Sequence, residues 1–213
     1  MNLEYKYWYF GSAVPHRICD DIIKYAQLQK EEQAITGNLT LNRDLTKNPI
    51  TKDEIKTVKK KRDSNVVFMN EKWIYNETQP YIAMANKKAG WNFDWDWSES
   101  IQFTKYKENQ FYGWHCDSAD KPYDLPDDLH RHGKIRKLSV TVCLSDETEY
   151  EGGDFEFDFR NNDGGKTQPS VCKEIRPKGS VIVFPSFVWH RVKPVTSGTR
   201  YSLVMWNLGR PFR

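Results

Sequence analysis

Two histidines and an aspartate in the second half of the chain have the residue types and spacing of a metal site. His115 and Asp117 lie two positions apart in the segment WHCD, and residues i and i+2 of a β-strand point to the same side. A third ligand must come from a distant segment. His190 in FPSFVWHRV is the best candidate, because it lies in another strand-like segment. This ligand set leaves open positions on the ion and is that of the non-haem Fe(II) oxygenases. A zinc hydrolase would accept the same set.

An arginine that follows His190 adds a second chemical group to this region. Residues 194–198 have the composition of a turn, so a hairpin would bring Arg200 back beside the metal. On the strand that begins there, the Arg200 guanidinium and the Ser202 hydroxyl share one face. A guanidinium matches a carboxylate bidentately, and a serine donates one more hydrogen bond. A metal at one end and this clamp at the other would suit a short dicarboxylate such as 2-oxoglutarate.

Each of these residues also has an ordinary structural interpretation. Without a metal, His115 and Asp117 would form a hydrogen-bonded pair, and His190 would be half-buried in the core. Arg200 alone would form a surface salt bridge. Short motifs match by chance, but the presence of Arg200 in addition to the histidines and the aspartate favours the metal site.

The elements that must position these residues change in character near residue 90. Before it, apolar residues at helical spacing predict helices over 15–30 and 71–89, the second kinked or split by Pro80. Residues 36–65 are polar and irregular. After it, alternation with period two predicts short strands. The eight candidate strands are 101–106, 111–116, 138–144, 155–159, 171–176, 181–184, 188–193 and 200–207.

This order predicts a mostly β fold with N-terminal helices, in which the helices pack on one face of a jelly-roll core. We expect one domain over 1–213, with 1–90 as a helical support region and 91–213 as the catalytic core. Two long loops, 118–134 and 160–170, are expected to be functional. We interpret 118–134 as a lid over the substrate rather than as a second metal site built on its sequence His130-Arg131-His132.

The composition excludes several classes of protein. The chain is 14% aromatic, which disordered chains avoid. Its net charge of +3 is too small to indicate a nucleic-acid binder, but it does not exclude one. No apolar run reaches the roughly 18 residues of a membrane span, and the first residues, MNLEYKYWYF, do not read as a signal peptide. The four cysteines form no CxxC motif, so a zinc ribbon is not expected. We therefore expect reduced thiols, a cytoplasmic location and no membrane.

Two charged runs are expected to lie on solvated faces. The first is KKKR at 59–62, and the second is the acidic stripe of Asp154, Glu156 and Asp158 on one strand.

Three segments carry a resemblance to a known family. They are ESIQFTKYKENQFYGWHCD, KLSVTVCLSDETEYEGGDFEF and KGSVIVFPSFVWHRVKPVTSGTRYSLVMW. Together they resemble the Fe(II)/2-oxoglutarate-dependent oxygenases of the prolyl 4-hydroxylase-like superfamily, and most of all the PKHD-type hydroxylases. The likeness runs from about Arg62 to Trp206.

The resemblance implies a double-stranded β-helix in which His115, Asp117 and His190 bind Fe(II) and form the catalytic centre. It also implies that Arg200, helped by Ser202, binds the distal carboxylate of 2-oxoglutarate. Some prolyl hydroxylases add a tyrosine to this carboxylate from a strand position that here is a cysteine, Cys143, and Tyr106 is the candidate for the missing phenol.

The activity implied by the resemblance is hydroxylation of a C–H bond, coupled to decarboxylation of 2-oxoglutarate to succinate and carbon dioxide. Dioxygen is the oxidant, and ascorbate is a candidate reductant. A prolyl residue of a protein or peptide is the leading substrate. A nucleobase or a small metabolite is the alternative within this chemistry, and a catalytically silent jelly-roll binding module is the alternative outside it. The sequence does not indicate an oligomeric state.

Overall fold

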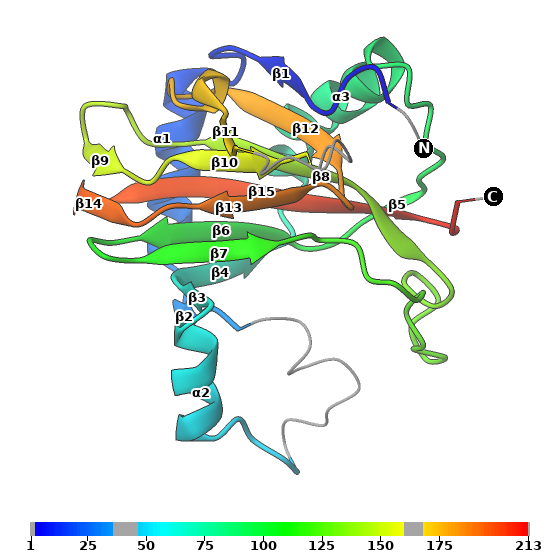
Figure 1. Ribbon diagram of the computed structural model, residues 1–213, viewed down its shortest axis with the longest axis horizontal. Coiled ribbons are helices and arrows are strands. Elements are labelled where there is room, and N and C mark those ends of the chain that lie inside the picture. The colour runs from blue at the N-terminus through cyan, green and yellow to red at the C-terminus, as the bar shows by residue number, and fades with distance from the viewer. Residues whose placement is uncertain (1–2, 36–46, 160–167, 213) are drawn as a thin grey trace.

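Two antiparallel sheets form a jelly roll in the computed structural model of the chain, which describes residues 3–35, 47–159 and 168–212 (Figure 1). The larger sheet has the order β1 (Trp8–Phe10), β12 (Val181–Pro185), β8 (Ile135–Cys143), β15 (Arg200–Gly209), β6 (Ile101–Tyr106), β4 (Asn65–Met69) and β2 (Glu32–Gln33), and β5 (Trp97–Ser98) also pairs with β15. The smaller sheet has the order β11 (Ser170–Val171), β10 (Phe155–Asp158), β13 (Trp189–Val192), β7 (Phe111–His115) and β3 (Arg62–Asp63). A separate pair joins β9 (Tyr150–Gly152) to β14 (Val195–Gly198). The predicted mostly β fold is confirmed.

The helices cover one face of the larger sheet, as the sequence predicts. α1 (His16–Gln27) and α3 (Lys72–Lys88) each present a buried stripe, for example Ile22 and Ile74, to the apolar side chains of β8, β12 and β15. The burial of apolar surface from the helices and from the sheet stabilises this packing. α3 continues through Pro80 rather than splitting there, and it ends before Gly90, whose φ of +68° suits glycine.

The two faces of β8 differ in chemistry because side chains alternate along a strand. Leu138, Val140 and Val142 pack toward the helices. The opposite face carries Ser139 and Cys143 and is turned toward the smaller sheet, where an aromatic core lies between the layers. The main site residues of β15, Arg200 and Ser202, are buried on this inner side.

The segment 36–65 has more structure than its polar sequence predicts. α2 (Lys52–Lys59) begins at Thr51, whose side chain accepts a hydrogen bond from the Glu54 backbone while the Glu54 carboxylate accepts one from the Thr51 backbone. This reciprocal cap stabilises a helix that has only one buried residue, Val58. β3 and the start of β4 come from the same region, and residues 36–46 lie outside the described part.

One expected strand is corrected, and one expected loop is confirmed. The strand expected over 171–176 is wrong beyond Val171, because a 3₁₀ turn over Lys173–Ile175 follows. Cys172 and Ile175 are buried three positions apart, which is the spacing of such a turn rather than of a strand. The loop at 118–134 contains no helix or strand, as predicted, whereas most of 160–170 lies outside the described residues.

The acidic stripe is solvated only in part, because Asp154 and Asp158 are half-buried and Glu156 is buried. Glu156 is 5% exposed, because Arg191 of β13 and Lys193, which follows that strand, cover and neutralise it. Asp154 pairs with Arg176 and Lys193.

In the part of the chain that the structure describes, no helix has both the length and the apolar character needed to cross a bilayer.

Candidate metal centre

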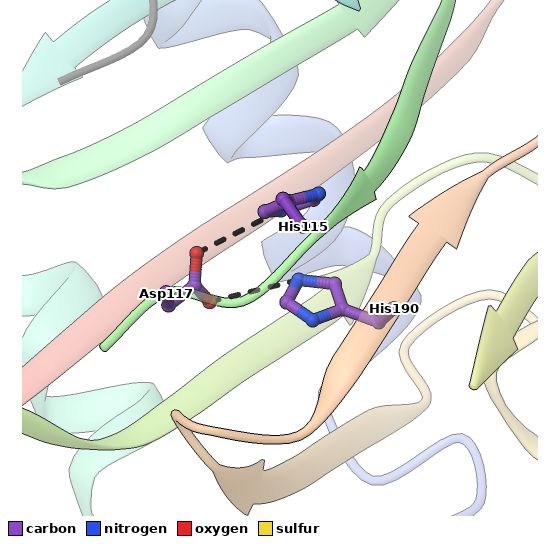
Figure 2. A group of neighbouring side chains, drawn as sticks. All are labelled: His115, Asp117 and His190. Carbon is purple, nitrogen blue, oxygen red and sulfur yellow. Dashed lines mark ion pairs between the residues drawn. The ribbon is translucent and has the colours of Figure 1, made fainter. Parts of the chain in front are cut away.

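The structure brings His115, Asp117 and His190 together at the end of two paired strands (Figure 2). His115 closes β7 and Asp117 follows it, while His190 lies on β13 directly opposite His115 in the register. One ligand atom from each residue lies within 4.8 Å of the other two. His115 Nε2 is 3.7 Å from Asp117 Oδ1, and His190 Nε2 is 3.6 Å from Asp117 Oδ2. Two nitrogens and a carboxylate therefore converge on one point.

Hydrogen bonds fix which nitrogen of each ring can bind a metal. His115 Nδ1 lies 2.8 Å from the Gly113 carbonyl oxygen, and His190 Nδ1 lies 2.9 Å from that of Val188. A carbonyl only accepts, so each Nδ1 carries the proton and each Nε2 has a free lone pair. Burial, helped by His190, lowers the pKa of His115 to about 3. The ring is therefore neutral at physiological pH, which is the form that ligates a metal.

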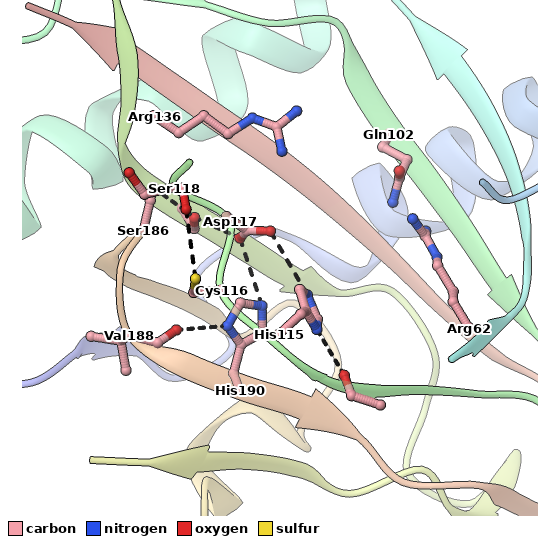
Figure 3. Close-up of polar contacts among 12 residues, drawn as sticks. Arg62, Gln102, His115, Cys116, Asp117, Ser118, Arg136, Ser186, Val188 and His190 are labelled. Atoms are coloured by element: carbon pink, nitrogen blue, oxygen red, sulfur yellow. Dashed lines mark hydrogen bonds and ion pairs between the residues drawn. The ribbon is translucent and has the colours of Figure 1, made fainter. Parts of the chain in front are cut away.

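Two serines hold Asp117: Ser139 contacts its carboxylate, and Ser186, which Figure 3 labels, contacts its backbone. Ser139 Oγ donates to Asp117 Oδ2 at 2.7 Å and lies 2.9 Å from Ser186 Oγ. The Ser186 carbonyl accepts the backbone N–H of Asp117 at 2.8 Å. Burial would raise the pKa of Asp117, but His190, His115, Arg136 and the Ser139 bond outweigh it, so this pKa lies below its usual value. Sequence reasoning missed both serines, although they stand in the segments KLSVTV and VFPSF.

Arg200 lies at the other end of a narrow cavity that begins at these three residues. The cavity is lined by His115, Asp117 and His190 at one end and by Arg200 and Ser202 at the other. Arg200 is 1% exposed, and its Nη1 donates to Ser202 Oγ at 3.3 Å. Burial lowers its pKa, but its neighbours, Tyr150 first, hold it above the usual value, so the guanidinium is charged. No carboxylate of the described residues forms an ion pair with it.

The structure places Tyr106 on the wall of the same cavity. β6 pairs with β15 so that Tyr106 is opposite Arg200, and the Arg200 Cζ lies 5.6 Å from the centre of the phenol ring. Tyr106 is buried, which raises its pKa and keeps it a neutral hydrogen-bond donor. A second tyrosine, Tyr150, also reaches the guanidinium, and the sequence did not single it out.

A larger groove of about 980 Å³ opens from Asp117 toward solvent. Its aromatic lining residues are Phe68, Tyr75, Trp95, Trp97, Tyr112, Tyr123 and Trp206. Four acidic side chains apart from Asp117 also line it, namely Glu32, Asp96, Glu99 and Asp128. The groove is therefore aromatic and of mixed charge.

The loop 118–134 forms one wall of this groove. Tyr123 donates to Glu99 Oε1 at 3.0 Å, and the His130 ring stacks on Trp97 with centroids 3.9 Å apart. Among the described residues, the His115 group is the one cluster of histidine, cysteine and acidic side chains with metal-binding spacing, so the loop histidines form no second site.

Two buried nitrogens at the junction of the cavity and the groove have no hydrogen-bond acceptor among the described residues. They are Arg62 Nη2 and Trp206 Nε1. The solvated face expected for 59–62 is wrong for Arg62, which is 4% exposed because β3 pairs with β7 and places its guanidinium 4.5 Å from the centre of the Tyr112 ring. Lys60 and Lys61 are exposed as expected.

Comparisons with known proteins agree with this geometry. A PKHD-type hydroxylase of Synechococcus sp. (strain CC9902) is 36% identical over 108 residues, which are 50% of this chain and 40% of that protein. The match thus spans less than half of the relative's length. Two solved structures share the fold. A viral collagen prolyl hydroxylase of Paramecium bursaria Chlorella virus-1, in complex with 2OG, has a TM-score of 0.61 and 20% identity over 97% of both chains.

The second solved structure is a prolyl hydroxylase of Trichoplax adhaerens in complex with a peptide fragment of the hypoxia inducible factor oxygen degradation domain. It has a TM-score of 0.57 and 12% identity, over 96% of this chain and 84% of that one. A sequence profile for the 2OG-Fe(II) oxygenase superfamily matches residues 101–207. Because this profile spans half of the chain and includes both histidines, the aspartate and Arg200, the chain belongs to the 2OG-Fe(II) oxygenase superfamily.

Proposed function

We propose that the chain is an Fe(II)- and 2-oxoglutarate-dependent dioxygenase that hydroxylates a C–H bond. The observation that carries this proposal is the buried Arg200, a charged side chain without a carboxylate partner among the described residues, at the far end of a cavity that starts at the metal-binding cluster. A buried charge is costly unless it is paired. A dicarboxylate that reaches from the metal to Arg200 would pair it.

The donor set fits iron. His115 and His190 would each supply Nε2, and Asp117 would supply one carboxylate oxygen, which leaves positions for a chelating ligand and dioxygen. Bound Fe(II) supplies the redox chemistry that activates dioxygen. The chain supplies the position of each partner: Ser139 and Ser186 hold Asp117, and Arg200 with Ser202 holds the distal carboxylate. In the overall reaction, one oxygen atom enters the substrate and the other enters succinate, while the 2-oxoglutarate carboxyl group leaves as carbon dioxide.

The groove supports a prolyl residue in a peptide as the substrate. Its aromatic lining is the kind of surface on which proline-rich segments dock. Arg62 Nη2 and Trp206 Nε1 could donate to peptide carbonyls, because buried N–H groups need acceptors. The acidic side chains of the groove outnumber its arginines, Arg62, Arg131 and Arg136, so the groove has no excess of cations to neutralise the phosphates of a nucleic-acid backbone. The peptide in the Trichoplax structure agrees with this kind of partner.

The substrate is tested by mass spectrometry of candidate products. We expect a decamer of proline with blocked ends to gain oxygen atoms when Fe(II), 2-oxoglutarate and air are all present, and to stay unmodified when any of them is omitted. A single-stranded oligonucleotide serves as the competing candidate. Oxygen gained by the oligonucleotide and not by the peptide would replace the prolyl substrate with a nucleobase. The absence of succinate from every reaction would contradict the dioxygenase itself.

Variants at the two unpaired donors test how the peptide is held. Arg62→Met removes a charged donor, and such hydrogen bonds contribute about 1.5–3 kcal/mol, so we expect the KM for the proline decamer to rise about 10- to 150-fold. Trp206→Phe removes a neutral donor and keeps most of the ring, so a rise of about fivefold is expected. Lys60→Met is the matched control, because Lys60 is an exposed neighbour of Arg62. Steady-state kinetics with the decamer varied is the measurement, and equal KM values for Lys60→Met and Arg62→Met would refute this role.

A further inference from the structure

The tyrosine of the segment EYEGGD lies behind the arginine of the proposed clamp. Tyr150 begins β9 and is 4% exposed. Its ring lies beside Arg200, because a Cβ placed at Gly153 would be 3.5 Å from Tyr150 Cε2 and 3.0 Å from Arg200 Cδ. Tyr150 also helps to hold the pKa of Arg200 above its usual value. Unlike Tyr106, Tyr150 is not among the residues that line the narrow cavity. It therefore approaches the arginine from outside the cavity in which the proposed dicarboxylate would bind.

The direction of each bond in this cluster follows from its chemistry. A guanidinium only donates, so Tyr150 accepts from Arg200 and its own proton is left for the Cys143 sulfur. The Cys143 thiol lies 3.5 Å from the carbonyl oxygens of Ser145 and Arg176, either of which can accept its proton. The chemistry of both neighbours therefore favours an orientation of the phenol that turns its oxygen toward Arg200.

The rest of the motif shapes the space around the arginine. A Cβ at Gly153 would lie 3.0 Å from Arg200 Cδ, and the φ of +62° at this position also favours glycine. Arg176 fixes Tyr150 from the other side, with its Cζ 5.1 Å from the ring centre and its Nη1 3.2 Å from the Gly152 carbonyl oxygen. Residues 150–153 thus leave space for the aliphatic part of Arg200 and place the Tyr150 hydroxyl near its guanidinium.

We propose that Tyr150 is a positioning residue for co-substrate binding, and that its hydroxyl orients the Arg200 guanidinium toward the distal carboxylate of the dicarboxylate ligand. This inference rests on the proposed function, since it assumes that Arg200 binds that carboxylate. Burial of Tyr150 away from the cavity wall separates its role from that of Tyr106, which faces the ligand directly.

Tyr150→Phe removes the hydroxyl and keeps the ring. We expect the Kd of 2-oxoglutarate for the Zn(II)-loaded protein, measured by calorimetry, to rise about tenfold, as for loss of a hydrogen bond to a charged group. Zinc has no redox chemistry, so binding is measured without turnover. The Kd of 2-oxobutyrate, which lacks the distal carboxylate, is expected to stay the same. In the iron-loaded enzyme, the KM for 2-oxoglutarate should rise about tenfold while kcat changes less than twofold.

Tyr81→Phe is the matched control, because it removes a phenol that donates to the Ala13 carbonyl far from the cavity. If Tyr150→Phe weakens 2-oxoglutarate and 2-oxobutyrate equally, its role is only structural and the inference is overturned. The inference also fails if the variant discriminates between the two ligands as well as the parent does. Failure of the parent protein itself to prefer 2-oxoglutarate over 2-oxobutyrate would instead overturn the Arg200 clamp, and with it the proposed function.

Discussion

Replacement of His115 by alanine is expected to abolish iron-dependent formation of succinate. The change removes one of the two nitrogens in the cluster and leaves Asp117 facing a single imidazole. Even loss of an outer partner of a metal ligand costs about 10- to 100-fold in affinity or activity, so loss of a ligand should cost more than about 100-fold. Iron titration of the purified variant, followed by a succinate assay at saturating 2-oxoglutarate, measures both effects.

Two comparisons make this result specific. His132→Ala removes an exposed histidine of the loop 118–134, so it should retain the parent activity. Ser139→Ala removes the hydrogen bond to Asp117 and should lower activity by about 10- to 100-fold, between the other two variants. Parent-level turnover in His115→Ala would show that the three residues are an ordinary buried cluster and not the metal site.

Arg200→Met is expected to raise the KM for 2-oxoglutarate by about 30-fold to several thousand-fold. The substitution keeps an unbranched side chain of similar length and removes the charge that would face the distal carboxylate. Loss of one partner of a buried hydrogen-bonded charge pair costs about 2–5 kcal/mol, and about 1.4 kcal/mol corresponds to a factor of ten. Initial rates of succinate formation over a range of 2-oxoglutarate concentrations give this KM.

An analogue of the co-substrate provides the control for this prediction. 2-Oxobutyrate has no distal carboxylate, so Arg200→Met should use it about as well as the parent does. Arg200→Lys keeps the charge without the planar fork and should lie between the two. An unchanged KM for 2-oxoglutarate in Arg200→Met, with the iron affinity intact, would contradict the clamp.

The local pattern of the sequence is sufficient to predict that His115 and Asp117 lie on the same side of the chain. Alternation along a strand places His115 and Asp117 on one side, and the structure agrees even though β7 ends at His115. The pairing of His190 with His115 comes from the register between β13 and β7, which the spacing of the residues does not contain. The resemblance to a family of known fold was needed to join the two halves.

The burial of several other polar residues, inside the site and outside it, could not be predicted because their partners are distant in the sequence. Arg62 ends a run of lysines and looks like one more solvated cation, but pairing of β3 with β7 carries it into the pocket. Glu156 alternates with phenylalanines as an outward residue would, and its ion pairs with Arg191 of β13 and with Lys193 just after it explain its burial. Tyr150 lies on a three-residue strand, which is too short for an alternation pattern.

Because side chains alternate along β8, its two faces have different roles, and each face can be substituted separately. Leu138, Val140 and Val142 contribute to the free energy of unfolding through their packing with the helices. Ser139, on the opposite side of the same backbone, supports the carboxylate of the metal cluster. Substitutions that repack the helical layer can therefore alter thermal stability and leave the chemistry untouched, so long as the backbone of this strand keeps its path. Substitutions meant to raise thermal stability should therefore be confined to the even-numbered, apolar positions of β8, and Ser139 should be kept.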